Sequence, residues 1–337
     1  MSLNATWLSA LRTQAEPAVL VTLARAQGSV PREAGAKMLV TRDRLFDTIG
    51  GGHLELRAAE IAREMLADTQ AAPVVHYRFP LGPSLGQCCG GVAELVFEYL
   101  PWPRPVWVEE LAALLDAGRA ADLHTSFEAG APKVIAASSA GHGVCELRRD
   151  GVALALAERI SPCDFRIMLF GAGHVGSALA AILAALPCEL TWLDSREGQF
   201  PQALPGNVRA ETDDALESRA SRAFPGTYYL VMTHDHALDQ AVSEAILRRG
   251  DFAWFGLIGS ATKRSLFERR LLARGIAQQM LDRMTCPIGI AGIGGKQPGV
   301  IAVAVAAQLL AAREAELHAR SLAGLAKGAS LPVKAAG

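Results

Sequence analysis

The stretch that decides the fold is "RIMLFGAGHVGSALAAIL", residues 166–183, where an apolar run leads through a glycine-rich turn into a helical pattern. Gly171, Gly173 and Gly176 stand in G-x-G-x-x-G spacing directly between the predicted strand and the predicted helix. The first glycine permits a tight turn, the second lets a phosphate approach the backbone, and the third allows close helix packing. The N–H groups at the helix start favour an anion. The turn therefore predicts a phosphate-bearing ligand, and a purely structural turn is the alternative.

Strands and helices continue to alternate after this turn. Further strands are predicted in "CELTWLD", "TYYLVMT" and "DFAWFGLIG", with helices between them. This alternation indicates a doubly wound parallel sheet, so we predict a Rossmann-like domain over residues 164–318. Asp194 ends "CELTWLD", at the place where dinucleotide-binding folds carry their ribose-binding acid. Residues 319–337 lose hydrophobic periodicity and are predicted to form a flexible tail.

The preceding sequence predicts a compact α+β domain over residues 1–100. Helical spacing in "NATWLSALRTQ" is followed by strand-like segments such as "PAVLVTLARA" and "VAELVFEYL", and a helix opens at "GGGHLE". Three prolines in "LPWPRP" mark a boundary, and residues 101–163 are interpreted as a connecting subdomain. The predicted fold class is α/β, with an N-terminal α+β domain followed by a C-terminal Rossmann-like doubly wound parallel sheet.

Composition narrows the functional classes. Half of the 337 residues are hydrophobic, a fifth are charged, and the formal net charge is −1. This balance gives no electrostatic reason to expect nucleic acid or an acidic membrane as a partner. The first residues lack the basic region and long apolar core of a signal peptide, and "GVIAVAVAAQLLAA" is too short to span a bilayer. We expect a soluble cytoplasmic protein.

The cysteines are few, and two of them are adjacent. Six cysteines in a chain of this length do not resemble a secreted disulfide framework, and their spacing matches no paired CxxC zinc site. Cys88 and Cys89 lie in "LGQCCGG", where neighbouring cysteines form a disulfide only with strain and glycines offer nothing to pack against. The pair therefore indicates reactivity.

Two further segments are candidate anion sites on the same edge of the predicted sheet. "THDHALD" places His234 just beyond a strand, and in "GSATKR" a strand ends before a helix that carries Ser260, Lys263 and Arg264. Each segment has an ordinary alternative. Thr233 or Asp235 in the first and the serine in the second would cap the following helix, with histidines and basic residues in solvent.

Seven motifs in order resemble the xanthine dehydrogenase accessory proteins of the XdhC/CoxI type. The motifs are "RAQGSVPREAGAKMLV", "TIGGGHLE", "GQCCGG", "LFGAGHVG", "THDHALDQA", "FGLIGSATKR" and "CPIGIAGIGGKQPGVIAVAVAAQLL". Together they extend over nearly the whole chain, and "GGGHLE" with "CPIGI" is similar to the xanthine dehydrogenase branch of the family.

The resemblance implies a molybdenum cofactor chaperone and not an enzyme. Such a protein protects the cofactor (molybdopterin), presents it for sulfuration and inserts it into apo xanthine dehydrogenase. The implied partners are that apoenzyme, a cysteine desulfurase-type sulfur donor, cofactor biosynthesis proteins and a second copy of the chain in a homodimer or other homo-oligomer.

The resemblance also implies which residues bind the cofactor. Cys89 and Cys88 are the candidate molybdenum ligands, and His53 and Glu55 are their polar neighbours. The candidate phosphate or pterin contacts lie in the second domain: Gly171, Gly173, Gly176, Ser260, Lys263 and Arg264. Asp194 and His234 complete the predicted cofactor-binding residues. An NAD(P)-dependent oxidoreductase is the alternative function, supported by the glycine turn and Asp194.

Overall fold

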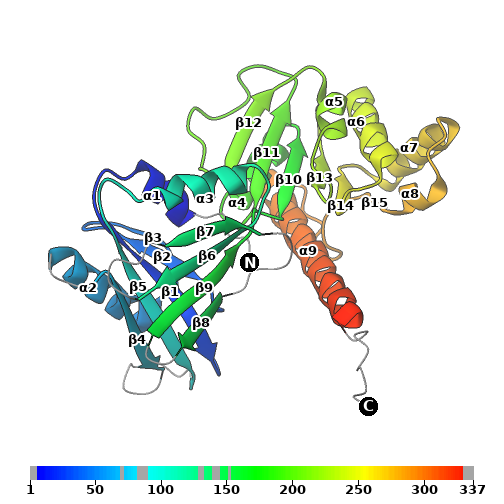
Figure 1. Cartoon of the computed structure of the whole chain (residues 1–337). Helices are drawn as coiled ribbons and strands as arrows, with labels where there is room; N and C mark the ends of the chain where they lie inside the picture. Colours follow the sequence, from blue (N-terminus) through cyan, green and yellow to red (C-terminus); the bar gives the residue numbers. More distant parts are fainter. Residues whose placement is uncertain are drawn as a thin grey trace, which may run out of the picture. The chain divides into compact units, whose positions relative to one another are not determined.

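The chain folds into two compact units, Met1–Pro162 and Cys163–Gly337 (Figure 1). The structure is a computed structural model, and it describes residues 6–68, 72–81, 90–127, 133–138, 145–150 and 153–328.

The first unit is built on a five-stranded antiparallel sheet with β1 at its centre. Its order is β3-β2-β1-β5-β4, with β1 at Ala18–Gln27, β2 at Lys37–Val40, β3 at Leu45–Asp47, β4 at Val74–Pro80 and β5 at Val92–Leu100. One face packs on α2 (Gly52–Ala67), whose Leu54 and Ala58 share a buried cluster with Val21 and Phe97. β1 is buried on both faces, which explains its nearly continuous apolar sequence.

The other face of this sheet shares a core with residues beyond the prolines. There a second antiparallel sheet has the order β7-β6-β9-β8, with β6 at Ala121–Ser126, β7 at Val134–Ala137, β8 at Cys145–Asp150 and β9 at Ala153–Ile160. Leu20 of β1 and Leu123 of β6 belong to one buried cluster with residues of α1 (Thr6–Thr13) and α3 (Trp107–Asp116). The segment predicted to connect two domains thus packs against the first sheet.

Two buried ion pairs also join the two sheets of this unit. Lys37 of β2 donates from Nζ to Glu158 of β9 at 2.5 Å and to the hydroxyl of Thr22 at 2.7 Å. Lys133 donates to Glu98 of β5 at 2.6 Å. Because an uncompensated buried charge costs several kcal/mol, each pair favours this one alignment of the sheets.

The second unit is a six-stranded parallel sheet, which confirms the predicted Rossmann-like architecture. Its order is β12-β11-β10-β13-β14-β15, with β10 at Arg166–Phe170, β11 at Glu189–Asp194, β12 at Val208–Thr212, β13 at Tyr228–Val231, β14 at Trp254–Leu257 and β15 at Met284–Thr285. Numbered along this unit, the order is 3-2-1-4-5-6, that of dinucleotide-binding domains. The two outermost strands, β12 and β15, were not predicted.

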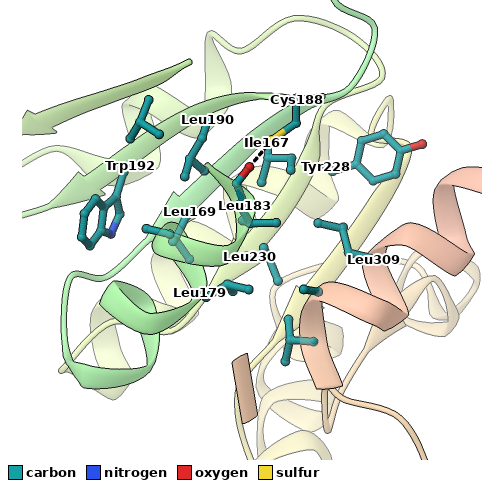
Figure 2. Close-up of a cluster of buried hydrophobic side chains, with 14 of the residues drawn as sticks. Ile167, Leu169, Leu179, Leu183, Cys188, Leu190, Trp192, Tyr228, Leu230 and Leu309 are labelled. Carbon is teal, nitrogen blue, oxygen red and sulfur yellow. Dashed lines mark hydrogen bonds between the residues drawn. The ribbon is translucent and has the colours of Figure 1, made fainter. Parts of the chain in front are cut away.

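Helices cover both faces of this sheet. On one face, α4 (His174–Leu183) and α9 (Pro298–Gly328) pack on the strands, and Figure 2 shows Leu183 of α4 and Leu309 of α9 beside Ile167, Leu169 and Leu230. The other face carries α5 (Leu216–Ser221), α6 (His236–Arg249), α7 (Ala261–Ala273) and α8 (Gln278–Asp282). α9 continues as a helix into the segment predicted to be a tail, as far as Gly328. Among the described residues, no helix has the length and apolar character needed to cross a membrane.

Candidate functional site

The glycine turn after β10 is held by close backbone packing at its first and third glycines. Gly171 has a φ of 113°, and a Cβ there would lie 2.2 Å from the carbonyl oxygen of Met232. A Cβ on Gly176 would lie 2.1 Å from the carbonyl oxygen of Gly171. Trp192 of β11 donates its indole N–H to that same oxygen at 3.1 Å. These two glycines are therefore required by the fold itself.

The middle glycine of the turn has a different environment. Gly173 is exposed, its φ is −74°, and a Cβ there would meet no described heavy atom within 4 Å. It precedes α4, whose N-terminus has no side-chain cap among the described residues. The fold leaves this backbone open at the position where a phosphate contacts a dinucleotide-binding domain.

Asp194, at the end of β11, is engaged by the protein's own donors. Its Oδ2 accepts from the amide of Ala172 at 2.6 Å and from Nη2 of Arg196 at 3.0 Å. Its Oδ1 accepts from the amide and from Nε of Arg196, at 2.9 and 3.0 Å. Burial, the largest influence, raises the pKa of Asp194, but together the hydrogen bonds from Arg196 and Ala172 outweigh it and lower the pKa. The carboxylate thus fixes the glycine turn.

A buried polar network joins the loops after β13 and β14. Asp239 is fully buried and accepts from the amide of Thr233 at 2.9 Å and from the hydroxyl of Thr233 at 2.7 Å. Its other carboxylate oxygen accepts from Nζ of Lys263 at 2.6 Å, and the same ammonium donates to the carbonyl of Ile258 at 2.9 Å. The structure thus places Lys263, a predicted phosphate contact, in an ion pair that holds these two loops together.

The helix caps expected in both anion segments are present. The second alternative also expected its basic residues in solvent, which is wrong for Lys263, because that side chain is only 11% exposed. Asp235 caps α6 by accepting from the amides of Ala237 and Leu238, and its neighbour His234 is exposed. Ser260 caps α7 by accepting from the amide of Lys263 at 3.2 Å.

Arg264, the last of the predicted phosphate contacts, lies one turn into α7. Its Nε donates to Glu268 at 2.7 Å, and its Nη1 donates to the carbonyl of Cys286 at 3.0 Å. Its side chain is one-third exposed, so it also reaches solvent. The arginine therefore ties α7 to the segment after β15.

In the first unit, three motif loops meet through glycines. A Cβ on Gly50 would lie 2.4 Å from Cβ of Pro31, and a Cβ on Gly91 would lie 2.4 Å from the carbonyl oxygen of Ser29. A Cβ on Gly28 would lie 3.2 Å from Cα of Gly91. The segments "QGSVPRE", "TIGGG" and the last glycines of "QCCGG" are therefore side by side. The spacing along the sequence carried no signal of this arrangement.

Glu55 organises the loop before α2. Its Oε2 accepts from the amides of Ile49 and Gly51 at 3.0 and 3.1 Å, and from the hydroxyl of Thr48. Gly50, Gly51 and Gly52 all have positive φ, a conformation that favours glycine, so the carboxylate stabilises a loop that other residues would strain. His53 follows, exposed, in the first turn of α2.

Cys88 and Cys89 lie outside the described residues, but their flanks are described. Leu81 donates its amide to the carbonyl of Gly91 at 2.8 Å, so the two ends of the segment that carries the cysteines are held together. No cluster of three or more histidine, cysteine, aspartate or glutamate side chains that could hold a metal occurs in the part of the chain that is described.

The four remaining cysteines are poor candidates for a soft-metal site. Cys163, Cys188 and Cys286 are buried and Cys145 is partly buried. Burial raises the pKa of all four thiols, to about 12 for Cys145 and Cys188. Since the thiolate is the form that binds metals, these thiols are suited to packing and not to ligation.

The sheet order and the glycine turn define a protein with a Rossmann unit. In the unit that precedes it, three glycine loops meet, and one of these loops directly follows a pair of cysteines in the sequence. Residues 167–309 match the profile of the XdhC Rossmann domain, and residues 11–78 match that of the XdhC and CoxI family. The two matches together extend over more than half of the chain. The protein belongs to the XdhC and CoxI family.

The chain is also similar to individual proteins. The chain is 33% identical to the uncharacterized protein YqeB of Escherichia coli (strain K12) over 153 residues, which are 43% of this chain and 27% of YqeB. It is 25% identical to a protein of Bacillus subtilis (strain 168) named as a probable xanthine dehydrogenase subunit, over 92% of this chain and 97% of that protein. A crystal structure described as a xanthine dehydrogenase from Bacillus halodurans has the same fold, with a TM-score of 0.69 at 21% identity over 94% of this chain and 96% of that one.

Proposed function

We propose that this protein is an accessory protein of xanthine dehydrogenase that binds the molybdenum cofactor, protects it and inserts it into the apoenzyme. The observation that carries the proposal is the meeting of three motif loops at Gly28, Gly50 and Gly91, because Gly91 directly follows the "QCCG" segment. Because a side chain at Gly50 or Gly91 would collide with a neighbouring loop, these glycines bring the three loops together next to the segment that carries the cysteines in the sequence. Family membership and the similarity to a probable xanthine dehydrogenase subunit support the same role.

Each unit carries candidate contacts for the cofactor, and they are proposed for each unit separately. In the first, Cys89 or Cys88 binds molybdenum through sulfur, because a thiolate suits a metal already held by dithiolene sulfurs. His53 lies in the first turn of α2, and Glu55 keeps the loop before that helix in place. In the second, the open backbone at Gly173 receives the phosphate of the pterin.

The proposed partners follow from the cargo. A cofactor that needs a terminal sulfur has to meet a sulfur donor before insertion, so a cysteine desulfurase-type protein, the cofactor biosynthesis proteins and the apoenzyme are expected to dock on this chain. We also propose that the protein is a homo-oligomer that works in the cytoplasm and does not itself catalyse purine oxidation.

The ligand that copurifies with the protein tests the proposal. Protein isolated from cells that make molybdenum cofactor is expected to release a pterin that becomes fluorescent on oxidation, in proportion to bound molybdenum. The control is protein from cells that cannot make the cofactor. Stoichiometric nicotinamide nucleotide with no pterin would instead establish the alternative, an NAD(P)-dependent oxidoreductase.

Gly173 offers a sharper test of the glycine turn. Gly173→Val is expected to fold, because no described heavy atom lies within 4 Å of the added Cβ, and its φ of −74° suits any residue. The valine would occupy the space of a phosphate, so we expect cofactor affinity to fall at least about tenfold, or roughly 1.4 kcal/mol. Gly206→Val controls for a general effect, because that glycine lies in the same unit outside the turn, is equally open and is not among the glycines with positive φ. Unchanged affinity in folded Gly173→Val protein would make the turn purely structural.

A further inference from the structure

The acid at the end of β11 has no acceptor position left for a ligand. A carboxylate offers about four lone-pair sites. Asp194 accepts four hydrogen bonds, one from the amide of Ala172 and three from the amide, Nε and Nη2 of Arg196. The residue is 1% exposed. In dinucleotide-binding domains the acid at this place accepts hydrogen bonds from ribose hydroxyls, and here those positions are filled.

Arg196 is bound in a way that resists displacement. Its guanidinium makes two parallel hydrogen bonds to the carboxylate, the geometry in which arginine binds a carboxylate most strongly. Arg196 stands only two residues beyond Asp194 and also donates its own backbone amide to it. The backbone therefore holds the arginine close to the carboxylate. Moving the guanidinium away would leave a buried carboxylate with half of its partners, which is costly.

The same arrangement fixes the glycine turn. Oδ2 of Asp194 accepts from both Ala172, which stands between the first two glycines, and Arg196. A ribose that displaced Arg196 would therefore share Oδ2 with the amide that keeps the turn in shape. The side chain of Arg196 is 37% exposed, so it lies between the buried acid and solvent.

We propose that Arg196 is a specificity-determining residue that closes the ribose position of this Rossmann unit to NAD(H) and NADP(H). The glycine turn is left for a phosphate-bearing ligand that does not require Asp194 as an acceptor. This deepens the proposed function, on which it rests for the nature of that ligand, since the pterin of the molybdenum cofactor carries a phosphate but no ribose.

Removal of the guanidinium tests the proposal by a gain of binding. Arg196→Ala takes away one donor from each oxygen of Asp194, and these are the two acceptors that a ribose diol needs. Titration with NADH, followed by nicotinamide fluorescence, is expected to show no saturation with the wild-type protein. Arg196→Ala is expected to bind NADH at least about tenfold more tightly than the wild type, or roughly 1.4 kcal/mol.

Three controls define the result. Arg166→Ala removes the same charge from the same unit at an exposed ion pair with Glu189, and is expected to behave as the wild type. Arg196→Ala/Asp194→Asn is expected to lose the gained affinity, because the acceptor carboxylate is gone. Arg196→Met keeps more of the side-chain volume and is expected to gain NADH binding also if Arg196→Ala proves poorly folded.

Several results would overturn the proposal. Saturable NADH binding by the wild type would mean that the ribose position is open, and tight NADPH binding by the wild type would mean that Arg196 binds a 2′-phosphate. Folded Arg196→Ala and Arg196→Met with no gain would show that Arg196 is not the barrier. These outcomes are separate from the pterin-release test, which asks about the cargo and not about the ribose position.

Discussion

Lys263→Met is expected to lower the free energy of unfolding by about 3 kcal/mol, because it leaves the carboxylate of Asp239 buried without its counter-charge. Asp239 is fully buried, and the side chain of Lys263 is 11% exposed. Loss of one partner of a buried ion pair typically costs about 3–5 kcal/mol. The two hydrogen bonds from Thr233 remain and place the expected value at the lower end. Urea denaturation of the isolated protein measures it.

A double variant separates the ion pair from the space that it fills. Lys263→Met/Asp239→Leu replaces both partners by apolar side chains, which is often neutral at a buried pair, so most of the lost stability is expected to return. The backbone amide of Thr233 and the carbonyl of Ile258 would still lose a partner each, so recovery is expected to be incomplete. A matched surface control is Arg248→Met, because the pair of Arg248 with Glu244 is more exposed and such pairs contribute little.

The same variants decide what Lys263 does for the ligand. If it contacts a phosphate directly, both Lys263→Met and the double variant lose cofactor affinity equally. If it acts only by joining the loops after β13 and β14, affinity returns with stability in the double variant. The two hydrogen bonds that the ammonium makes inside the protein favour the second outcome. A double variant as stable as the wild type and still unable to bind cofactor would contradict this interpretation.

The parallel sheet could be predicted from sequence because its central strands are buried on both faces. β10, β13 and β14 are short and almost wholly apolar, and each is followed by a turn and a helix. The edge strands were missed because they do not show this pattern of a longer run of buried apolar residues. β12 is the half-exposed segment "VRAET", and β15 has only two residues, so neither carries a run of apolar side chains long enough to recognise.

The glycine turn and the helix caps could also be predicted, because both are local. The glycines of the turn stand close together in the sequence, and Asp235 and Ser260 cap the helices that immediately follow them. The contact of Gly171 with Met232 is long-range and was not predicted. The contact between Gly28 and Gly91 is also long-range, because it joins the loop after β1 to the loop before β5, far apart in the sequence. Such long-range pairings depend on register, which composition does not specify.

The occupied state of Asp194 was outside what the sequence indicates. Its position at the end of the second strand predicted a ribose acceptor. The sequence "LDSRE" also shows Arg196 two residues later, but not where its side chain lies. Whether that arginine turns back to the acid or away from it depends on side-chain torsions and on the amide of Ala172. The structure resolves this choice with four hydrogen bonds to one carboxylate.

The largest functional effect is expected from Cys88→Ala/Cys89→Ala, which should abolish activation of apo xanthine dehydrogenase. Metal ligation needs a thiolate, and burial raises the pKa of the four other thiols: Cys145, Cys163, Cys188 and Cys286. The adjacent pair is therefore the remaining source of a soft, exchangeable ligand. A single labile sulfur contact also permits release, whereas a closed four-ligand cage would retain the metal.

The single variants rank the two thiols. Cys89→Ala is expected to lower cofactor occupancy more than Cys88→Ala, since Cys89 directly precedes Gly90 and Gly91, where the loops of the first unit meet. Molybdenum and pterin per protein, the rate of apoenzyme activation and the melting temperature are measured together. Cys163→Ala is the control, because that cysteine lies in the other unit and outside every motif. If the double variant kept its cofactor and still activated the apoenzyme at the wild-type rate, molybdenum would not be held through these sulfurs.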